Sequence, residues 1–404
     1  MTISLEVPDV SRLRRTRVAV ATLFFILGAG FGSWAVRIPD VQHRLHLSAG
    51  ELGSCLLAVA VGSMIGMPAA DVISARIDSA RSAPTAAVGF SVAIGLAAAA
   101  PGLATLILAL LLLGLGNGML NVLMNSQGVR LERDRGKPVM AGLYAACSVG
   151  GLVGSVTAGL AAEAGLAPSV HLALVAGLLA ALAVGADPSL IEGSTAPALA
   201  GFPLPRAAAL PLGMLAFCDQ FCQGTVADWS SVYLHNAVHV RAALAGIGYS
   251  AFVIALAAGR LAGDTLSLRF GPRRLVCAAG AAAFTGASIS LLGRTVLPVV
   301  CGFVVLGLGL SAVFPRAVSA AGRRAGGQAE SAVAAVSAIG YSGFLVGPPL
   351  VGFLAQGTNL SIAMAAMLQC SIGIMLLSRA LPVAEYGGRK KAPSTELSQR
   401  WTAD

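Results

Sequence analysis

The stretch GRLAGDTLSLRFGPRR, residues 259–274, is the part of the chain that most constrains its fold. It joins the end of one long apolar run, 243–264, to the start of the next. Gly271 and Pro272 predict a tight turn between the two runs, because these are residue types that turns select. Asp264 is expected to face cations and the N-terminus of the second helix. A plain basic loop is the alternative interpretation.

The composition places the chain in a membrane. Of its 404 residues, 56% are hydrophobic and only 11% are charged, and the mean hydropathy is +0.81. Soluble domains carry about 25% charged residues. Many apolar runs reach the roughly 20 residues that an α-helix needs to cross a bilayer. The alternating segments of about 10 residues that mark an outer-membrane barrel are not seen. We therefore expect an all-α membrane protein with many spans.

Twelve transmembrane helices are expected. They cover approximately residues 17–36, 49–70, 84–102, 104–128, 138–162, 170–187, 207–232, 243–264, 275–293, 295–320, 330–355 and 359–380. Each run is close to the length of a helix that crosses the hydrocarbon core. The connections on one side of the membrane are short, and those on the other side carry most of the charge.

The distribution of Lys and Arg predicts the orientation. With both termini inside, all but four of the 27 Lys and Arg residues lie in inner segments. The outer four are Arg37, Arg44, Arg241 and Arg294. Because cytoplasmic segments are enriched in Lys and Arg, we expect a multi-pass protein of the bacterial inner (cell) membrane with both termini cytoplasmic. The net charge of +9 then reflects topology and attraction to anionic membrane lipid rather than binding of nucleic acid.

The chain contains an internal repeat. Matching residues recur at a nearly constant offset: Trp34 and Gly53 match Trp229 and Gly248 at 195, and at 193 Gly66 and Asp71 match Gly259 and Asp264, Gly114 and Gly116 match Gly307 and Gly309, and Gly150 and Gly154 match Gly343 and Gly347. A shared offset predicts that six spans are repeated in parallel as six more. We expect an N-terminal six-helix bundle over 1–187, a cytoplasmic linker over 188–206, and a C-terminal bundle with a cytoplasmic tail over 207–404.

Two parallel six-helix halves are the architecture of the major facilitator superfamily (MFS), and the chain resembles that superfamily over its whole length. Residues 259–274 resemble its inner-loop signature, in outline G-x-x-x-D-x-x-G-R-R. The resemblance implies a brace that steadies one gating state, formed by Gly259, Asp264, Arg269, Gly271, Arg273 and Arg274. The matching site of the first half keeps Gly66 and Asp71 but lacks the glycine turn.

A narrower resemblance is to the YbjJ-like permeases of the bacterial inner membrane, which are distantly akin to fucose-type sugar permeases. It is carried by GSWAVRIPDVQ (32–42), by DWSSVYL (228–234), and by the run that begins NVLMNSQGVR at residue 121. Membership of the superfamily implies a small-molecule substrate that binds in a cavity lined by spans one, four, seven and ten.

Span four carries Asn117, Asn121 and Asn125, which share one helix face because they are four residues apart. Each amide offers two hydrogen-bond donors and an acceptor. Inside a membrane such groups face protein or water. They predict either hydrogen bonds between helices or a cavity wall that binds a polar solute. We favour the cavity wall, because span four lines the cavity in the superfamily that the chain resembles.

Span seven contains the polar stretch FCDQFCQGTVADWSS, residues 217–231. Asp219 lies about 18 Å from the inner end of this span, at about 1.5 Å per residue. A carboxylate at that depth is by default a functional hypothesis. We expect Asp219 to couple protons to transport, and a structural hydrogen bond is the alternative. Gln220 and Gln223 are expected to contact the substrate.

Other polar and aromatic residues are expected near the outer mouth. Asp228 is a second candidate for proton coupling, or a gate residue beside Trp229. Trp34 is expected at the matching level of span one and is a candidate substrate contact, since Trp favours the membrane interface. Arg37 and Asp40 follow span one and are expected to form a gate pair.

Arg316 follows Pro315, which is expected to bend span ten. Its guanidinium is expected to pair with Asp219 or with an anionic substrate, and snorkelling to the inner headgroups is the alternative. Ser48 and Glu51 fit a capping box at the start of span two, which favours a structural role for Glu51. The sequence shows no set of residues with the spacing of a metal site.

These features predict a secondary transporter that moves a small polar, sugar-like solute by alternating access between its halves, driven by protons. The sequence has no ATP-binding loop and no nucleophile–base pair that would suggest an enzyme, and no cofactor is expected. The expected partners are the substrate, protons and membrane lipid around a monomer. An efflux pump for drugs or metabolites and a non-transporting membrane receptor are the alternatives.

Overall fold

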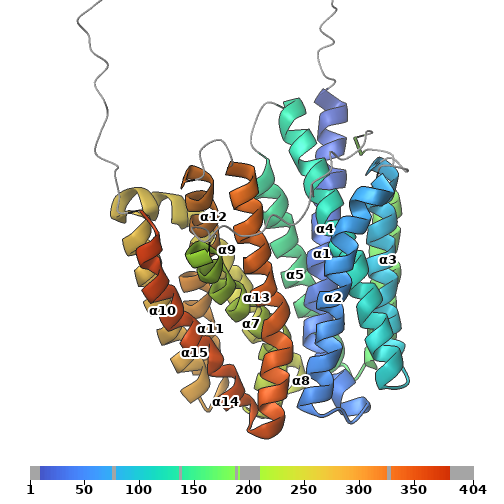
Figure 1. Ribbon diagram of the computed structural model, residues 1–404. Helices are drawn as coiled ribbons and strands as arrows, with labels where there is room; N and C mark the ends of the chain where they lie inside the picture. The colour runs from blue at the N-terminus through green and yellow to red at the C-terminus, as the bar shows by residue number, and fades with distance from the viewer. Residues whose placement is uncertain are drawn as a thin grey trace, which may run out of the picture.

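The computed structural model is a bundle of long α-helices (Figure 1). It describes residues 10–74, 79–135, 139–186, 190–191, 210–324 and 329–382. The first half contains α1 (Val10–Arg44), α2 (Ala49–Ser74), α3 (Ser79–Ala99), α4 (Leu103–Arg135), α5 (Met140–Glu163) and α6 (Pro168–Ala186). The second half contains α7 (Leu210–Asn236), α8 (Ala242–Ala245), α9 (Ile247–Phe270), α10 (Pro272–Leu292), α11 (Val296–Leu310), α12 (Val313–Arg324), α13 (Ala329–Gly357), α14 (Leu360–Met364) and α15 (Ala366–Leu377), followed by a 3₁₀ turn (Ser378–Ala380).

The helices confirm the expected all-α membrane architecture. Within the described ranges, ten helices are long and apolar enough to cross a membrane. The two remaining spans of the expected twelve are α7 and α9. Helix α7 carries acidic and amide side chains that lower its hydropathy, and the apolar part of α9 is Ile247–Gly263. The least apolar spans are therefore the ones that carry the polar side chains of the candidate site.

Two of the spans are broken into shorter helices. Helix α11 ends at Leu310 and α12 begins at Val313, so the expected tenth span bends where it was predicted to. Pro315 lies in the first turn of α12, where its missing N–H is tolerated because first-turn amides have no partner within the helix. The twelfth span is divided at Ala365, between α14 and α15.

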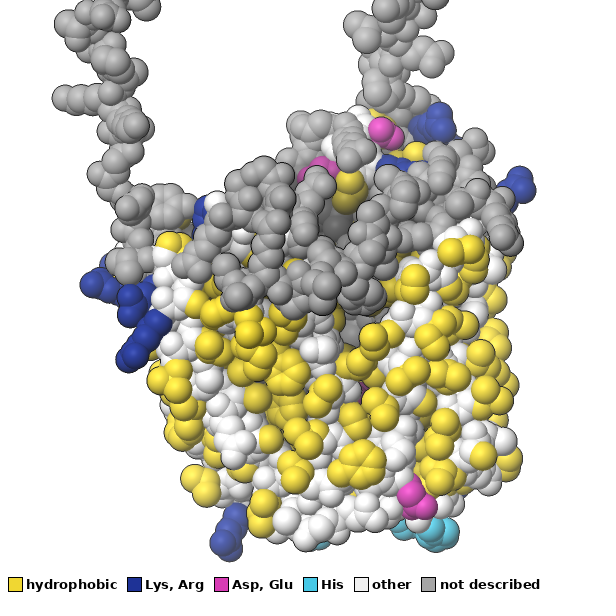
Figure 2. Space-filling view, viewed as in Figure 1, with side chains coloured by type: hydrophobic (Ala, Val, Ile, Leu, Met, Phe, Trp, Pro, Cys, Tyr) yellow, Lys and Arg dark blue, Asp and Glu magenta, His cyan; other side chains and the backbone are white. Residues whose placement is uncertain are grey.

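The flanks of the bundle are apolar. Leu261 and Leu292 are both 81% exposed, and Leu297 is 73% exposed. Figure 2 shows hydrophobic side chains over the sides of the molecule, with Lys and Arg side chains toward the two ends. Burying a leucine side chain is worth about 1.5–3 kcal/mol in water, so a soluble protein would not leave so many uncovered. We interpret these flanks as the lipid-facing surface.

The two halves pack their helices in the same pattern. In the first half α1 packs on α5, α2 packs on α4, and α3 packs on α4 and α6. In the second half α7 packs on α13, α9 packs on α11, and α10 packs on α11 and α15. Read in span order, these are the same pairs. The contacts confirm the parallel repeat that the matching residues predict.

The glycines of the repeat are the places where helices approach each other closely. A Cβ on Gly114 of α4 would press against the carbonyl of Val59 in α2, and one on Gly307 of α11 would press against the carbonyl of Phe252 in α9. Val59 and Phe252 differ by the same offset as the glycines. The same relation holds for Gly116 with Phe90 and Gly309 with Ala283, and for Gly150 with Phe25 and Gly343 with Phe217. The repeated residues are those that let two helices touch.

The two halves meet at one end of the bundle. Both ends of the described chain lie at the other end, here called the terminal face (Figure 1). At the opposite face α2 packs on α13, and α5 packs on α8 and α9. A Cβ on Gly352 would lie 2.7 Å from the Cα of Gly53, so the α2–α13 contact depends on both glycines. Ser155 and Ser250 are buried and share a hydrogen bond of 2.5 Å across the α5–α9 contact.

Toward the terminal face the halves diverge. In Figure 1 α2 and α13 converge at the opposite face and separate toward the terminal face. Tyr144 of α5 and Tyr341 of α13 interact electrostatically across the halves. They are nevertheless 47% and 48% exposed. The bundle is therefore closed at the opposite face and open at the terminal face.

The predicted linker over 188–206 lies outside the described residues, except for 190–191. Gln127 of α4 is buried and holds both backbone groups of Ile191. Its Nε2 donates to the Ile191 carbonyl at 2.8 Å, and the Ile191 N–H donates to its Oε1 at 3.0 Å. The start of the linker is thereby fixed to the first half. The division into 1–187 and 207–404 stays a prediction.

Gly271 forms the predicted turn between α9 and α10. Its backbone has φ 80° and ψ 153°, a region that is essentially restricted to glycine, where another residue costs about 1–3 kcal/mol. Pro272 is the first residue of α10, where its fixed φ suits the start of a helix. The turn therefore requires the Gly-Pro pair that residues 259–274 contain.

Candidate transport site

Asp219 lies in the interior of α7 and is fully buried. Its Oδ2 accepts a hydrogen bond of 2.7 Å from Nε2 of Gln223, one turn further along. Its Oδ1 has no hydrogen-bond partner among the described residues. A carboxylate offers about four acceptor sites over its two oxygens. The group therefore keeps free bonding capacity at a position shielded from water.

The Asp219 face of α7 differs from the faces that pack on its neighbours α13 and α15. The carbonyl of Phe217 lies against Gly343 of α13. The thiol of Cys222 donates to a backbone carbonyl of α15 at 3.7 Å. At about 100° per residue, Asp219 and Gln223 occupy the side of α7 that these contacts leave. The two cysteines of the stretch pack against helices, as predicted.

The two glutamines of α7 have different surroundings. Gln223 is partly exposed and lies on the Asp219 face. Gln220 is only 9% exposed and lies on the side of α7 that faces α13. In this conformation the structure therefore brings Gln223 to the candidate site and leaves Gln220 within the helix packing.

The three asparagines of α4 are partly buried and hydrogen-bonded. Asn117 Nδ2 donates to the hydroxyl of Ser63 in α2 at 2.9 Å. Asn125 Nδ2 donates to Oδ1 of Asn121 at 3.1 Å, and the hydroxyl of Tyr144 donates to Asn125 Oδ1 at 2.8 Å. Asn117 thus links two helices, whereas Asn121, Asn125 and Tyr144 form a polar chain that ends at a half-exposed tyrosine.

Arg260 of α9 is a residue that sequence interpretation placed only in the loop motif. Its side chain is exposed. It interacts electrostatically with Asp219 of α7, Tyr144 of α5 and Tyr341 of α13. Because these three residues come from both halves, the guanidinium lies between the halves. The sequence did contain the signal, since Arg260 falls inside the apolar run 243–264, where a charge is costly and marks a functional position.

The tryptophans predicted near the outer mouth are buried at the closed face. Trp229 is fully buried, and its Nε1 donates to the Pro348 carbonyl of α13 at 3.0 Å. Trp34 is 2% exposed and belongs to the hydrophobic core, so it is not open to solute in this conformation. Asp228 is partly buried and interacts electrostatically with Tyr249 of α9.

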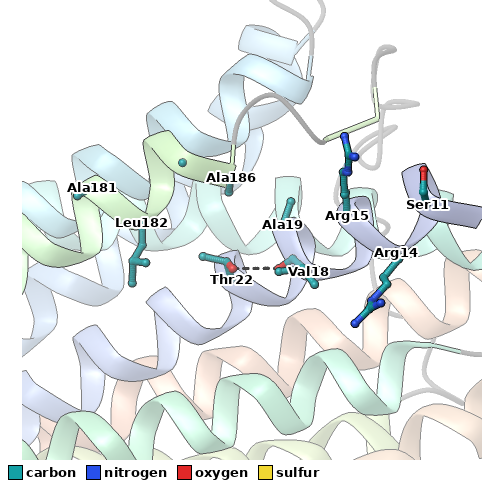
Figure 3. A pocket seen from close by; sticks show the side chains of 10 residues that line it. Ser11, Arg14, Arg15, Val18, Ala19, Thr22, Ala181, Leu182 and Ala186 are labelled. Atoms are coloured by element: carbon teal, nitrogen blue, oxygen red, sulfur yellow. Dashed lines mark hydrogen bonds between the residues drawn. The ribbon is translucent and has the colours of Figure 1, made fainter.

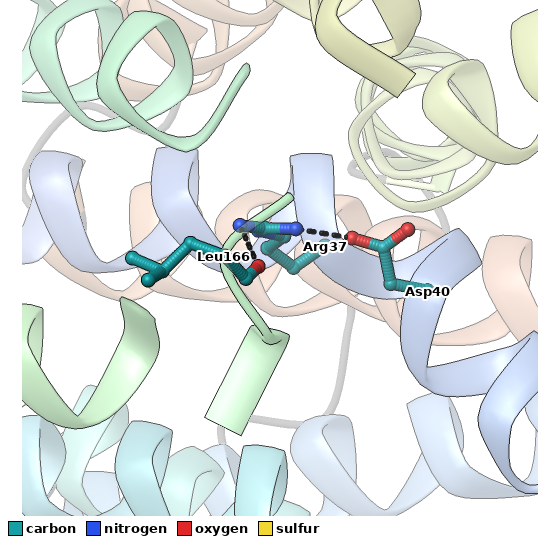
Figure 4. A network of polar contacts seen from close by, with 3 residues as sticks. All are labelled: Arg37, Asp40 and Leu166. Carbon is teal, nitrogen blue, oxygen red and sulfur yellow. Dashed lines mark hydrogen bonds and ion pairs between the residues drawn. The ribbon is translucent and has the colours of Figure 1, made fainter. Parts of the chain in front are cut away.

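Arg37 and Asp40 form the expected pair, but within one half of the protein (Figure 4). Helix α1 continues to Arg44, so both residues lie inside it rather than beyond its end. Arg37 Nη1 is 2.6 Å from Asp40 Oδ2, and its Nη2 donates to the Leu166 carbonyl at 2.9 Å. The guanidinium is 2% exposed and fixes α1 to the α5–α6 turn. This geometry joins parts of the first half and does not bridge the two halves.

The loop brace is described in part. Gly259 packs against Ser311 at the end of α11. Arg269 lies over the Phe270 ring, 5.4 Å from its centroid. Arg273 is partly buried and Arg274 is exposed. The side chain of Asp264, like that of Asp71, lies outside the described residues.

Arg316 of α12 reaches α9 instead of α7. Its Nη2 lies 3.8 Å from the position that a Cβ of Gly263 would occupy. The cation that interacts electrostatically with Asp219 is Arg260. The expected pairing of Arg316 with Asp219 therefore differs from what the structure shows, because the bend before Pro315 directs α12 toward α9.

Glu51 has the capping role that its spacing from Ser48 predicts. The Ser48 backbone N–H and hydroxyl both donate to Glu51 Oε2 at 2.8 Å, and the Glu51 N–H is 3.2 Å from the Ser48 hydroxyl oxygen. These reciprocal bonds satisfy free amides at the start of α2. Glu51 is thereby separated from the acids of α7.

Comparisons with known proteins identify relatives along nearly the whole chain. The chain is 31% identical over 375 residues to an uncharacterized MFS-type transporter of Yersinia pestis, which covers 93% of this chain and 97% of that protein. It is 32% identical over 351 residues to the transporter y4wD of Sinorhizobium fredii, covering 85% and 92%. It is also 32% identical over 363 residues to the membrane protein MosC of Rhizobium meliloti, covering 89% and 88%. A scan against models of known protein families finds no match.

Solved transporter structures share the fold at low sequence identity. The nucleoside transporter NupG superposes with a TM-score of 0.74 at 14% identity, covering 90% of this chain and 99% of NupG. A bacterial homologue of the human lysosomal transporter Spinster, in an inward-facing and unoccupied conformation, superposes with a TM-score of 0.72 at 14% identity, covering 92% and 98%. At this identity the likeness extends to the fold alone.

Proposed function

The chain belongs to the major facilitator superfamily and is a membrane transporter, and we propose that it moves a small polar, sugar-like solute by alternating access coupled to protons. It works as a monomer in the bacterial inner membrane with both termini cytoplasmic, so the terminal face is the inner one. Efflux of drugs or metabolites by the same fold is the alternative.

The observation that carries the proposal is the position of Asp219. The carboxyl group is buried in α7, and one of its oxygens is unpaired among the residues that the structure describes. An ionised carboxylate inside a membrane protein requires compensation. Asp219 has two sources of it, a proton on the free oxygen or the positive charge of Arg260. A group with two alternative compensations is suited to couple a proton to another event.

Competition for Arg260 supplies the coupling. A solute that engages the guanidinium draws it away from Asp219, and the carboxyl group then takes a proton. Solute and proton therefore bind together, and each raises the affinity for the other, as linkage requires. Release of the solute returns Arg260 to Asp219 and expels the proton. This order of events makes the protein a symporter.

The surrounding side chains favour a solute rich in hydroxyl groups. Asn121, Asn125 and Gln223 present amides, which both donate and accept hydrogen bonds as a sugar hydroxyl does. Tyr144 and Tyr341 add half-exposed aromatic rings. Such rings also suit a nucleobase, and a solved transporter of similar fold is a nucleoside transporter. Nucleosides are therefore the second solute class to test.

A thermal-shift screen of the purified protein tests the solute class. We expect a hexose, pentose or nucleoside to raise the melting temperature, because binding only to the folded state stabilises it. The Asn121→Ala variant is expected to lose this shift, since it removes an amide of the polar chain. Stabilisation by hydrophobic drugs alone would favour the efflux alternative instead.

Closure at the opposite face provides a test of alternating access. Gly352→Leu is expected to shift the protein toward a state open at that face. A leucine there would occupy the space now held by the backbone of Gly53 and the ring of Trp229, whose Cζ2 lies 3.1 Å from the Cβ position. The α2–α13 contact then separates, and solute no longer crosses because the halves cannot alternate.

Spin labels at the opposite face measure this shift. Ala167, in the α5–α6 turn, and Leu292, at the end of α10, are exposed and lie in different halves. With the exposed Cys277 and Cys301 replaced by Ser, labels at these two positions should show longer distances in the leucine variant by double electron–electron resonance. Gly357→Leu is the matched control, because its Cβ would meet no atom within 4 Å. Unchanged distances in the Gly352 variant would contradict closure by this contact.

A further inference from the structure

A groove of about 1010 Å³ lies between the first turns of α1 and the last turns of α6, at the terminal face (Figure 3). Arg14, Arg15 and Val18 line it on α1, and Leu182 and Gly185 line it on α6. The lining residues are distinct from those of the Asp219 site. The groove also opens on the outer surface of the bundle, where large apolar side chains are exposed.

The groove exists because its walls are made of small side chains. Ala181, Gly185 and Ala186 of α6 line it opposite Ala19 of α1. A Cβ on Gly185 would meet no atom within 4 Å. A larger residue at this position would therefore enter the groove without displacing the backbone.

The groove is charged at one end and apolar along the rest. Arg14 and Arg15 are exposed at the end nearest the chain terminus (Figure 3). Val18 and Leu182 are 61% and 37% exposed and line the remainder. Thr22 adds no free polar group, because its hydroxyl donates to the Val18 carbonyl at 2.9 Å. From Arg15 to Thr22 the helix rises about 10 Å, which is a large part of one leaflet of a bilayer with a core of about 30 Å.

We propose that this groove binds an anionic phospholipid of the inner leaflet. The phosphate lies at Arg14 and Arg15, whose guanidinium groups match a phosphate in charge and donor geometry. One acyl chain lies along Val18 and Leu182, which a free phosphate ion would leave uncovered. Basic grooves between helices on the cytoplasmic side favour anionic headgroups. The inference depends on the proposed orientation but does not depend on transport.

Native mass spectrometry of the full-length protein in detergent tests this proposal. Phosphatidylglycerol is expected to be retained and phosphatidylcholine with the same acyl chains is not. Arg14→Gln combined with Arg15→Gln should weaken phosphatidylglycerol binding by about thirtyfold, as expected for two arginines near a membrane surface. Arg12→Gln with Arg17→Gln removes the same charge from exposed positions outside the groove lining and should leave binding unchanged.

A second pair of variants tests the acyl-chain part of the groove. Gly185→Leu should abolish retention of phosphatidylglycerol by filling the groove. Gly177→Leu adds the same side chain on α6 where its Cβ also meets no atom, and should bind as the wild type does. Equal retention of the two lipids, undiminished binding by Gly185→Leu, or full displacement of the lipid by inorganic phosphate would each overturn the proposal. The lipid measurement needs no transport activity, so its outcome is separate from that of the proposed function.

Discussion

Replacement of Asp219 by Asn is expected to lower proton-driven accumulation of solute by about 100-fold, near the upper end of typical coupling energies. The amide keeps the size of the side chain and still accepts the 2.7 Å hydrogen bond from Gln223. It neither takes up a proton nor balances the charge of Arg260. The variant should therefore still bind and exchange solute, but it should not concentrate it.

The same variant is expected to lose the pH dependence of its conformation. In the proposed mechanism protonation of Asp219 releases Arg260, so the balance between the two open states changes with pH. Spin-label distances across the opposite face, recorded at acidic and at alkaline pH, should differ in the wild type and coincide in Asp219→Asn. Asp228→Asn changes the other acid of α7 and is the comparison. If only the Asp228 variant lost the pH dependence, the coupling site would be Asp228.

Gly150→Ala is expected to have the largest effect on folding. The added Cβ would press against the Phe25 carbonyl of α1 and lie 3.0 Å from the Ala29 nitrogen. These are backbone atoms, which cannot rotate away, so α1 and α5 must separate. We expect a loss of about 3 kcal/mol, at the upper end of the range for overpacking. Gly343→Ala, the counterpart in the second half, should be similarly damaging, because it meets the Phe217 carbonyl.

Thermal melting followed by tryptophan fluorescence, with size-exclusion chromatography for the folded yield, measures this loss. Gly177→Ala is the control, since its Cβ meets no atom within 4 Å. It should melt at or above the wild-type temperature, because Ala favours a helix over Gly by about 1 kcal/mol. If Gly150→Ala melted like Gly177→Ala, the glycine contacts would not hold the halves together as described.

The fold follows from two features that any sequence of this kind displays. Apolar runs of membrane-spanning length predict helices, because backbone groups in lipid must be satisfied within the segment. The repeat is visible because the glycines at helix contacts tolerate no substitution by larger residues, as Gly114 against Val59 and Gly307 against Phe252 illustrate. The turn at Gly271 is predictable for the same local reason, since its backbone conformation admits little else.

The candidate site was less predictable because it depends on contacts between distant segments. The expected pairing of Arg37 with Asp40 follows from their spacing on one helix, but the bond from Arg37 to the Leu166 carbonyl does not. The interaction of Arg260 with Asp219 depends on how α9 and α7 face each other. Burial of Trp34 and Gln220 depends on which end of the bundle is closed. These are properties of packing and conformation rather than of local pattern.

Uptake of radiolabelled solute into proteoliposomes, with and without an imposed pH gradient, tests the central claim most directly. The solute is the sugar or nucleoside that gives the largest thermal shift. The account predicts accumulation above the external concentration only when the outside is acidic, and collapse of that accumulation when a protonophore is added. Equal uptake with and without the gradient, or no movement of any stabilising solute, would contradict proton-coupled transport by this protein.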